Sequence, residues 1–326
     1  MKDYPAERIR AAYAECRRLA RRHYENFPVV SYLVPRPQRD ALAAIYAFAR
    51  SADDFADEPG QSRRLESLAE WRRRLTECYG GPDSRDSAGV PTQPEPADLV
   101  FLALGHAIRE FRLSQVNLEN LLRAFEFDVR ANRHKDFASL FDYCHYSANP
   151  VGRLVLELFG HREPELLVLS DAICTALQLT NFWQDVRVDL ERDRVYLPLD
   201  DLARFNLTVA DLEARMTPAP SGNGREATAD TVRDERWRKL MAFEVARTRQ
   251  LFERGRPLPD KVRPELRRQL RLTWLGGLAI LDKIESAGYD VFRHRPKLAR
   301  RDFLRLYLRA RRELAGVAAS AAGATA

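Results

Sequence analysis

Residues 41–58 read ALAAIYAFARSADDFADE, a run of helix-forming residues in which polar side chains recur at helical spacing. At about 100° per residue, Arg50, Asp53 and Asp57 fall within about 40° of Tyr46. The opposite half of this helix is apolar and forms the natural packing surface: Ile45, Phe48, Ala49, Ala52, Phe55 and Ala56. The pattern predicts an amphipathic helix whose acidic stripe is either hydrated or lines a cavity.

A DxxxD pair alone is a weak functional signal, because such pairs also occur on ordinary hydrated helix faces. Here Asp53 and Asp57 repel each other at i,i+4, and Asp54 and Glu58 add further negative charge. Each like-charged pair costs roughly a few tenths of a kcal/mol in an isolated helix. A bound cation would reverse this repulsion, which favours a metal-binding role.

A second acidic stripe is expected where the helical segment 164–190 runs into QLTNFWQDVRVDLERDRVYLP (178–198). Its polar residues are spaced three, four and four apart and fall on one helix face: Gln178, Asn181, Asp185 and Asp189. Carboxylate and amide oxygens are the donors that Mg²⁺ takes while it keeps waters and substrate phosphates. Neither stripe contains Cys or His, which disfavours zinc and copper.

Two such stripes in one chain predict a magnesium cluster between two facing helices, and the chemistry that suits it is removal of a diphosphate. Magnesium would neutralise the leaving group while the carbon–oxygen bond breaks. Arg50 would be an additional phosphate ligand. Tyr46, one turn from Arg50, would present an aromatic face to the carbocation that remains.

The rest of the chain is also helical in pattern, and no segment alternates with period two for long enough to require a strand. Helices are expected at 6–24, 38–58, 62–78, 97–111, 117–131, 137–159, 164–190, 230–254, 262–287 and 300–315. The Pro-, Gly- and Ser-rich stretches 80–96 and 217–229 are interpreted as mobile surface loops, and 316–326 as a disordered tail. We therefore expect an all-α protein in which residues 1–326 form a single domain.

Composition narrows the classes of partner. The formal net charge is +6, but arginines alternate with acids at helical spacing, so we interpret the charge as solvated helix faces and expect no nucleic acid. The four cysteines form no CxxC pair, which is consistent with a reduced, cytoplasmic protein. The start of the sequence lacks an apolar signal region, and no long uncharged apolar run predicts a membrane span. Loose peripheral membrane contact stays open, as does the oligomeric state.

At these residues the chain resembles the squalene/phytoene synthases, across roughly residues 10–300. The resemblance is carried by HYENF (23–27) ahead of Leu33 and Pro35, AIYAFARSADDFAD (44–57), DYCHYSANPVG (142–152) and the segment 178–198. It implies the isoprenoid-synthase helical fold, with a central cavity between two aspartate-rich helices and two or three Mg²⁺ ions.

The resemblance also implies roles for individual residues. The metal ligands would be Asp53, Asp57, Asn181, Asp185 and Asp189. Arg50 would hold the diphosphate, and the substrate cavity would be lined by Phe27, Tyr46, Gln178 and Tyr289.

Several departures from the family pattern narrow the expected substrate. Where condensing synthases have a Ser-Lys-Ser type run, this chain has Tyr24, Glu25 and Asn26, so a lysine for a second diphosphate is missing. The family's usual arginine before Asp185 is Gln184, and SANPVG replaces a glycine-rich stretch. In these respects the chain resembles the bacterial hydroxysqualene synthases of the hopanoid route, which act on presqualene diphosphate.

That subgroup suggests ionisation of presqualene diphosphate, rearrangement of the cation and capture by water, with no NADPH. An ordered water needs polar partners in an apolar cavity, and Asn149 or His145 could supply one. The alternatives are an ordinary partly buried histidine and a turn at Asn149 imposed by Pro150.

Two other functions compete with this one. A head-to-head synthase would condense two prenyl diphosphates to presqualene diphosphate, squalene, dehydrosqualene or phytoene. A catalytically inactive assembly factor would have the same fold, although such a protein is expected to lose its acidic stripes, and both stripes are present here.

Overall fold

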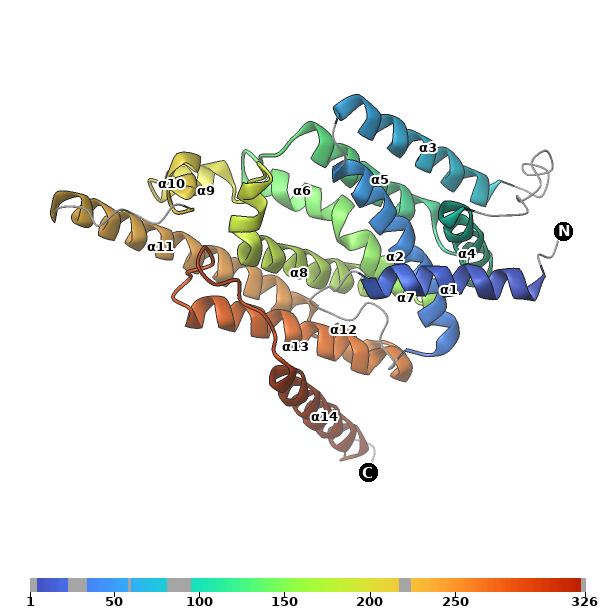
Figure 1. The fold of residues 1–326 in the computed structure, drawn as a ribbon. Coiled ribbons are helices and arrows are strands. Elements are labelled where there is room, and N and C mark those ends of the chain that lie inside the picture. The colour runs from blue at the N-terminus through green and yellow to red at the C-terminus, as the bar shows by residue number, and fades with distance from the viewer. Residues whose placement is uncertain (1–4, 23–33, 58–59, 81–94, 217–223, 324–326) are drawn as a thin grey trace. The chain divides into compact units, whose positions relative to one another are not determined.

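The computed structural model describes residues 5–22, 34–57, 60–80, 95–216 and 224–323, which are helices joined by short connections (Figure 1). No strand occurs within these ranges, where one isolated bridge joins Arg133 to Val195. The all-α prediction is therefore confirmed. Most of the predicted loop 80–96 (residues 81–94) and part of the loop 217–229 (residues 217–223) fall outside the described residues.

The chain forms two compact units, and each draws on three separate stretches of sequence. The first comprises residues 1–131, 149–167 and 260–269, and the second comprises 132–148, 168–259 and 270–326. Because the chain passes between the units several times, no single linker separates them. The single-domain prediction stays a prediction.

The first unit is built around α2 (Arg36–Asp57), which packs against five other helices. These are α1 (Ala6–Arg22), α3 (Gln61–Tyr79), α4 (Pro96–Phe111), α5 (Gln115–Arg130) and α7 (Asn149–Leu158). The apolar face predicted for α2 is buried at Ile45, Phe48, Ala52 and Ala56. Phe48 stacks on Trp71 of α3, whose indole N–H donates to the Phe48 carbonyl at 3.2 Å. Burial of this face leaves the stripe of Tyr46, Arg50 and Asp53 on the less buried side.

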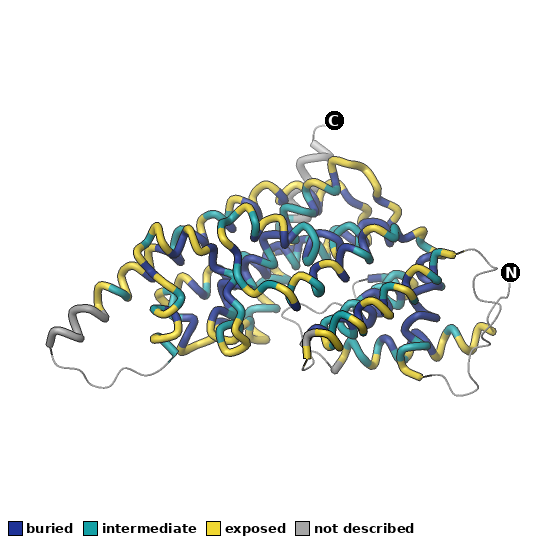
Figure 2. Tube along the Cα trace, turned by 90° about the horizontal axis from the view of Figure 1, so that it is seen from above, coloured by how far each residue is buried: buried dark blue, intermediate teal, exposed yellow. Residues whose placement is uncertain are grey.

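The second unit contains α6 (Phe137–Ser147), most of α8 (Pro164–Glu191), α9 (Leu199–Arg204), α10 (Val209–Ala214), α11 (Gly224–Gly255), most of α13 (Pro264–Ser286) and α14 (Arg300–Gly323). The short α12 (Leu258–Lys261) lies at the boundary of the two sequence ranges. Buried tryptophans join the long helices of the second unit. The Trp183 indole donates to Thr248 Oγ1 at 2.8 Å, and the Trp274 indole donates to the Phe252 carbonyl at 2.8 Å. Figure 2 shows buried positions on the inner sides of the helices of each unit.

Three expectations about element boundaries were wrong. The predicted helix 137–159 is two helices, because Pro150 has no N–H to donate to the preceding turn. Helix α11 begins at Gly224, inside the loop predicted for 217–229, and α14 runs to Gly323 through the predicted tail. Alanine has the highest helix propensity of all residues, which explains why the alanine-rich end of α14 is helical.

One described helix, α8, is long and apolar enough to cross a membrane by length and composition. Half of its most apolar window is buried inside the fold, as is common for core helices, so this is only a weak sign of a span.

Candidate active site

The acidic stripe of α2 carries a guanidinium that is ion-paired along its own helix. Arg50 donates to Asp53 Oδ2 at 2.9 Å and to Asp54 Oδ1 at 2.6 Å. Burial opposes the charge of Arg50, but the two carboxylates outweigh it and raise the pKa of the guanidinium. The Arg50 Nε–H is buried and finds no hydrogen-bond partner among the described residues. The Nε–H of Arg50 is therefore a donor that remains available to an anionic ligand.

Two further predicted residues of the first unit can be placed. Asp57 is the last residue of α2, and its side chain lies outside the described part of the structure. Asn149 begins α7 and is buried, with 3% of its surface exposed. Phe27 lies outside the described residues.

The acidic stripe of α8 is present as predicted. Gln178, Asn181, Asp185 and Asp189 lie on one continuous helix, and all four are half-buried. The neighbouring positions Leu179, Thr180, Phe182, Trp183, Gln184 and Val186 are buried. The stripe is therefore neither a fully hydrated face nor part of the core.

Asp185 has a partner that the sequence pattern did not indicate. Arg295 donates two hydrogen bonds to its carboxylate: Nη2 donates to Oδ2 at 2.7 Å, and Nε donates to Oδ1. Two contacts from α8 hold the chain segment that carries Arg295. The buried Gln184 side chain donates to the Pro296 carbonyl, and Arg187 donates to the Phe292 carbonyl at 3.0 Å. The only sequence signal is that Arg295 follows Tyr289 in a short segment with little helical pattern.

Tyr289 and His145 also belong to the second unit. Tyr289 has a left-handed backbone with φ of 64°, and its carbonyl accepts the Trp237 indole N–H at 2.9 Å. Burial, followed by the charge of Glu285, raises the pKa of its hydroxyl. His145 lies on α6, half-buried, with its ring edge-on to Tyr146 at 5.2 Å between centroids. The hydrogen bond from Trp237 joins Tyr289 to α11, whereas Tyr146 is the sequence neighbour of His145 on α6.

Oxygen donors along α8 fit a magnesium ion in chemistry. Asp185 and Asp189 are one turn apart and Asn181 lies one turn before them, so two carboxylates and an amide oxygen share a stripe. Within the described ranges, no three His, Cys, Asp or Glu side chains gather into a group that could hold a metal alone. A magnesium site on α8 would therefore need the diphosphate, or ligands from α2, to complete it. Convergence of the α2 and α8 stripes on one chamber stays a prediction.

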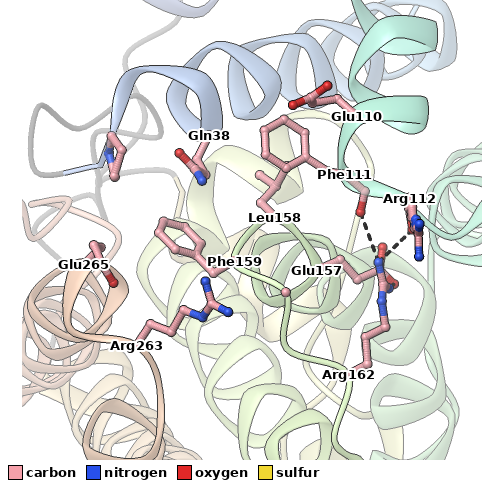
Figure 3. Close-up of a pocket in the computed structure, with 12 residues that line it drawn as sticks. Gln38, Glu110, Phe111, Arg112, Glu157, Leu158, Phe159, Arg162, Arg263 and Glu265 are labelled. Atoms are coloured by element: carbon pink, nitrogen blue, oxygen red, sulfur yellow. Dashed lines mark hydrogen bonds and ion pairs between the residues drawn. The ribbon is translucent and has the colours of Figure 1, made fainter.

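The first unit also contains a cavity of about 480 Å³ (Figure 3). Two of the charged residues around it serve the local fold. The buried Glu157 accepts from the Ser114 N–H at 2.9 Å and the Ser114 hydroxyl at 2.6 Å. Arg162 donates to the carbonyls of Phe111 and Arg112, at 3.0 and 2.8 Å. None of the described residues predicted for the active site lines this cavity.

The fold and the two acidic helices define an all-helical protein that carries a stripe of oxygen donors on each of two helices. The family model described as "Squalene/phytoene synthase" matches residues 20–302, and the chain belongs to this family. Members of the family are prenyltransferase-type enzymes, which generally use divalent metal ions with diphosphate substrates.

Three relatives illustrate the similarity. The phytoene synthase of Arthrospira platensis is 32% identical over 298 residues, which cover 87% of each chain. The hydroxysqualene synthase of Zymomonas mobilis is 40% identical over 192 residues, 58% of this chain and 59% of that protein. The crystal structure of the squalene synthase HpnC from Alicyclobacillus acidocaldarius superposes with a TM-score of 0.72 at 39% identity, covering 88% of this chain and 97% of that one.

Proposed function

We propose that this chain is a hydroxysqualene synthase, which converts presqualene diphosphate and water to hydroxysqualene and diphosphate. The observation that carries the proposal is the neutral, buried side chain of Gln184. Condensing synthases of the family usually have an arginine at this position, whereas Gln184 is neutral, 1% exposed, and bonded to the Pro296 carbonyl. With the lysine of the 23–27 motif also missing, the chain lacks two cations expected to bind a second diphosphate. A substrate with a single diphosphate needs neither cation.

Identity among the relatives supports the same choice. The hydroxysqualene synthase and the HpnC squalene synthase share 40% and 39% of aligned residues with this chain, compared with 32% for the phytoene synthase. The match to the hydroxysqualene synthase covers a smaller share of the chain, so the choice of substrate rests on Gln184 together with these values.

In this proposal the α8 stripe and Arg50 bind the diphosphate end of the substrate. Magnesium, when bound, would neutralise charge on the departing diphosphate. Asp185, Asp189 and Asn181 would hold the metal with Asp53 and Asp57, and the spare Nε–H of Arg50 would donate to a phosphate oxygen. Loss of the diphosphate breaks the carbon–oxygen bond and leaves a cyclopropylcarbinyl cation.

The hydrocarbon end of the substrate would lie among apolar and aromatic side chains, which keep bulk water from the cation. Tyr46, Phe27 and Tyr289 would provide aromatic faces that stabilise positive charge, and Gln178 would line the same cavity. After rearrangement to the linear skeleton, one water adds to the cation and loses a proton. Asn149 or His145 would position that water. Because water and not a hydride quenches the cation, the reaction needs no NADPH.

Product analysis tests the proposal. Purified protein with Mg²⁺ should convert presqualene diphosphate to hydroxysqualene, and NADPH should not change the product.

Asp185→Asn should lower kcat by roughly a hundredfold or more, because it removes a charged ligand from the leaving-group site. Asn149→Ala should change the partition between hydroxysqualene and other products if Asn149 positions the water. Unchanged partition would remove Asn149 from the mechanism.

The second candidate is a head-to-head prenyl synthase, which is favoured by the 87% mutual coverage with the Arthrospira platensis phytoene synthase. Incubation with farnesyl or geranylgeranyl diphosphate separates the two candidates. Efficient turnover of either substrate to a C30 or C40 product, with none of presqualene diphosphate, would overturn the hydroxysqualene assignment.

A further inference from the structure

Helix α14 presents an unusual outer face. Leu304 is 62% exposed and Leu308 is 45% exposed. They lie one helical turn apart, and no other two exposed large apolar residues in the described part of the chain are three or four positions apart in sequence. A pair of leucines on the solvent side of a surface helix is left without a packing partner. The two leucines form a small apolar patch, in contrast to the exposed apolar residues that stand singly elsewhere in the described part of the chain.

The leucine pair is bordered by positive charge on both sides. At about 100° per residue, Arg300 and Arg311 lie to one side of the leucines. Arg301, Arg305 and Arg312 lie to the other side. All five are exposed: Arg300, Arg301, Arg305, Arg311 and Arg312. None of them forms an ion pair with a residue that the structure describes. The face is therefore strongly cationic around an apolar centre.

The inner side of α14 is attached to the second unit. Asp302 lies 3.0 Å from Lys283 and Glu313 lies 3.5 Å from Arg271, both on α13, and Ala310 is fully buried. Asp302 is thus used on the side that faces the protein, and Glu313 pairs both with Arg271 and, at 2.9 Å, with Arg309 of α14 itself. This separation of charges leaves only leucine and arginine to dominate the outer face.

We propose that the outer face of α14, defined by Leu304, Leu308 and the five flanking arginines, docks the protein on an anionic lipid bilayer. Arginines beside the leucines would pair with lipid phosphates while the leucines enter the boundary of the acyl chains. A second copy of this face would be repelled by like charge. A nucleic-acid surface needs the arginines but gains nothing from exposed leucines at their centre.

This proposal is independent of the catalytic assignment, because binding to vesicles needs neither substrate nor Mg²⁺. Wild-type protein should sediment with vesicles of equal parts phosphatidylcholine and phosphatidylglycerol, and much less with phosphatidylcholine alone. High salt should weaken the binding, because the arginine contribution is screened. Failure of the activity assays would leave these results unaffected.

Variants locate the surface. Arg301→Gln with Arg305→Gln should lower the partition coefficient by about fivefold per arginine. Leu304→Ser with Leu308→Ser should lower it at least as much at unchanged net charge. The control is Val232→Ser with Arg238→Gln, an exposed apolar residue and an exposed arginine on α11, which should leave binding within about twofold per charge removed. Circular dichroism should show the same helicity for every variant.

A direct readout comes from Leu304→Trp. The four native tryptophans are all buried, so an added indole at 304 is the one expected to respond to lipid. Its emission should shift to the blue with anionic vesicles and stay unchanged without them. The proposal is overturned if wild-type protein does not bind the vesicles, or if the leucine variant binds like wild type. It is equally overturned if the face instead binds a DNA duplex or drives lipid-free dimerisation.

Discussion

At the scale of single residues, Glu244 is a buried carboxyl group whose ionisation opposes folding. It lies on α11 with none of its surface exposed, and neither carboxylate oxygen has a hydrogen-bond partner among the described residues. Arg247 is 3.4 Å away but is mainly engaged by Asp201, at 2.9 and 3.3 Å. Burial raises the pKa of Glu244 to about 8, against the opposing effect of Arg247.

Glu244→Gln should therefore stabilise the protein increasingly as the pH rises. The unfolded carboxyl loses its proton near pH 4.5 and the folded one near pH 8, so the wild type loses up to about 1.4 kcal/mol per pH unit between these values. The loss stops above the folded pKa. Urea unfolding of both proteins from about pH 5 to about pH 9 measures the difference. Glu213→Gln, at an exposed site on α10, is the control. If the unfolding free energies of Glu244→Gln and the wild type change in parallel with pH, the raised pKa assigned to Glu244 is contradicted.

Arg295 is the second residue whose role follows from the tertiary structure. Its guanidinium occupies the same carboxylate that Mg²⁺ is predicted to bind, so the ion pair and the metal compete for Asp185. The side chains of Arg295 and Asp185 are 35% and 20% exposed, and a pair this accessible to water contributes at most about 1 kcal/mol.

Arg295→Gln should accordingly tighten Mg²⁺ binding in the absence of diphosphate by up to roughly fivefold. Isothermal titration calorimetry of the metal alone measures this, with Arg295→Lys as the variant that keeps the charge and should stay close to wild type. If Arg295 also contacts the diphosphate, KM for the substrate should rise in the glutamine variant. An unchanged magnesium affinity would show that the pair does not compete.

At the scale of elements, the close approach of α13 to α11 and α8 depends on Gly277. A Cβ added there would lie 2.4 Å from Phe252 Cζ and 2.9 Å from Leu177 Cδ2. Phe252 is fully buried and its carbonyl accepts the Trp274 indole N–H, and Leu177 lies half-buried on α8. A single methyl group at this position must therefore move a ring or separate two helices.

Gly277→Ala should lower the free energy of unfolding by roughly 1–3 kcal/mol, the usual cost of overpacking, although alanine has the better helix propensity. Chemical denaturation gives the value. Phe252→Leu in the same background should recover part of the loss by removing the ring edge that the methyl group meets. A stabilised Gly277→Ala variant would show that helix propensity outweighs packing there.

At the scale of the whole molecule, the two acidic stripes belong to different compact units, with α2 in the first and most of α8 in the second. A shared metal site would make ligand binding depend on both units at once. Separate sites would leave each stripe to act alone.

Mg²⁺ with inorganic diphosphate should raise the melting temperature of the wild type by about 5 °C at a hundredfold excess over Kd. Asp53→Asn and Asp185→Asn should each abolish most of this shift, because both units hold the same ligand. Asp142→Asn, at an exposed position on α6, is the matched control and should keep the full shift. A shift that survives either stripe variant unchanged would contradict a shared chamber.

Local sequence determined the helical fold, the apolar face of α2 and the half-buried stripe of α8, because helical periodicity is a short-range property that reads directly from spacing. It also identified the family through motifs at 44–57 and 178–198. The break at Pro150 and the extension of α14 were misjudged. There the effects of one proline and of alanine-rich propensity decided the boundaries, and hydrophobic periodicity did not.

Only tertiary structure brought Arg295 to Asp185, placed Gln184 against the Pro296 carbonyl, buried Glu244 without a hydrogen bond, and left Leu304 and Leu308 on the outer face of α14. These pairings join residues up to 112 positions apart, or depend on which side of a helix meets the core. Spacing along one helix specifies which residues share a face, but the partner of that face is selected by packing between distant segments.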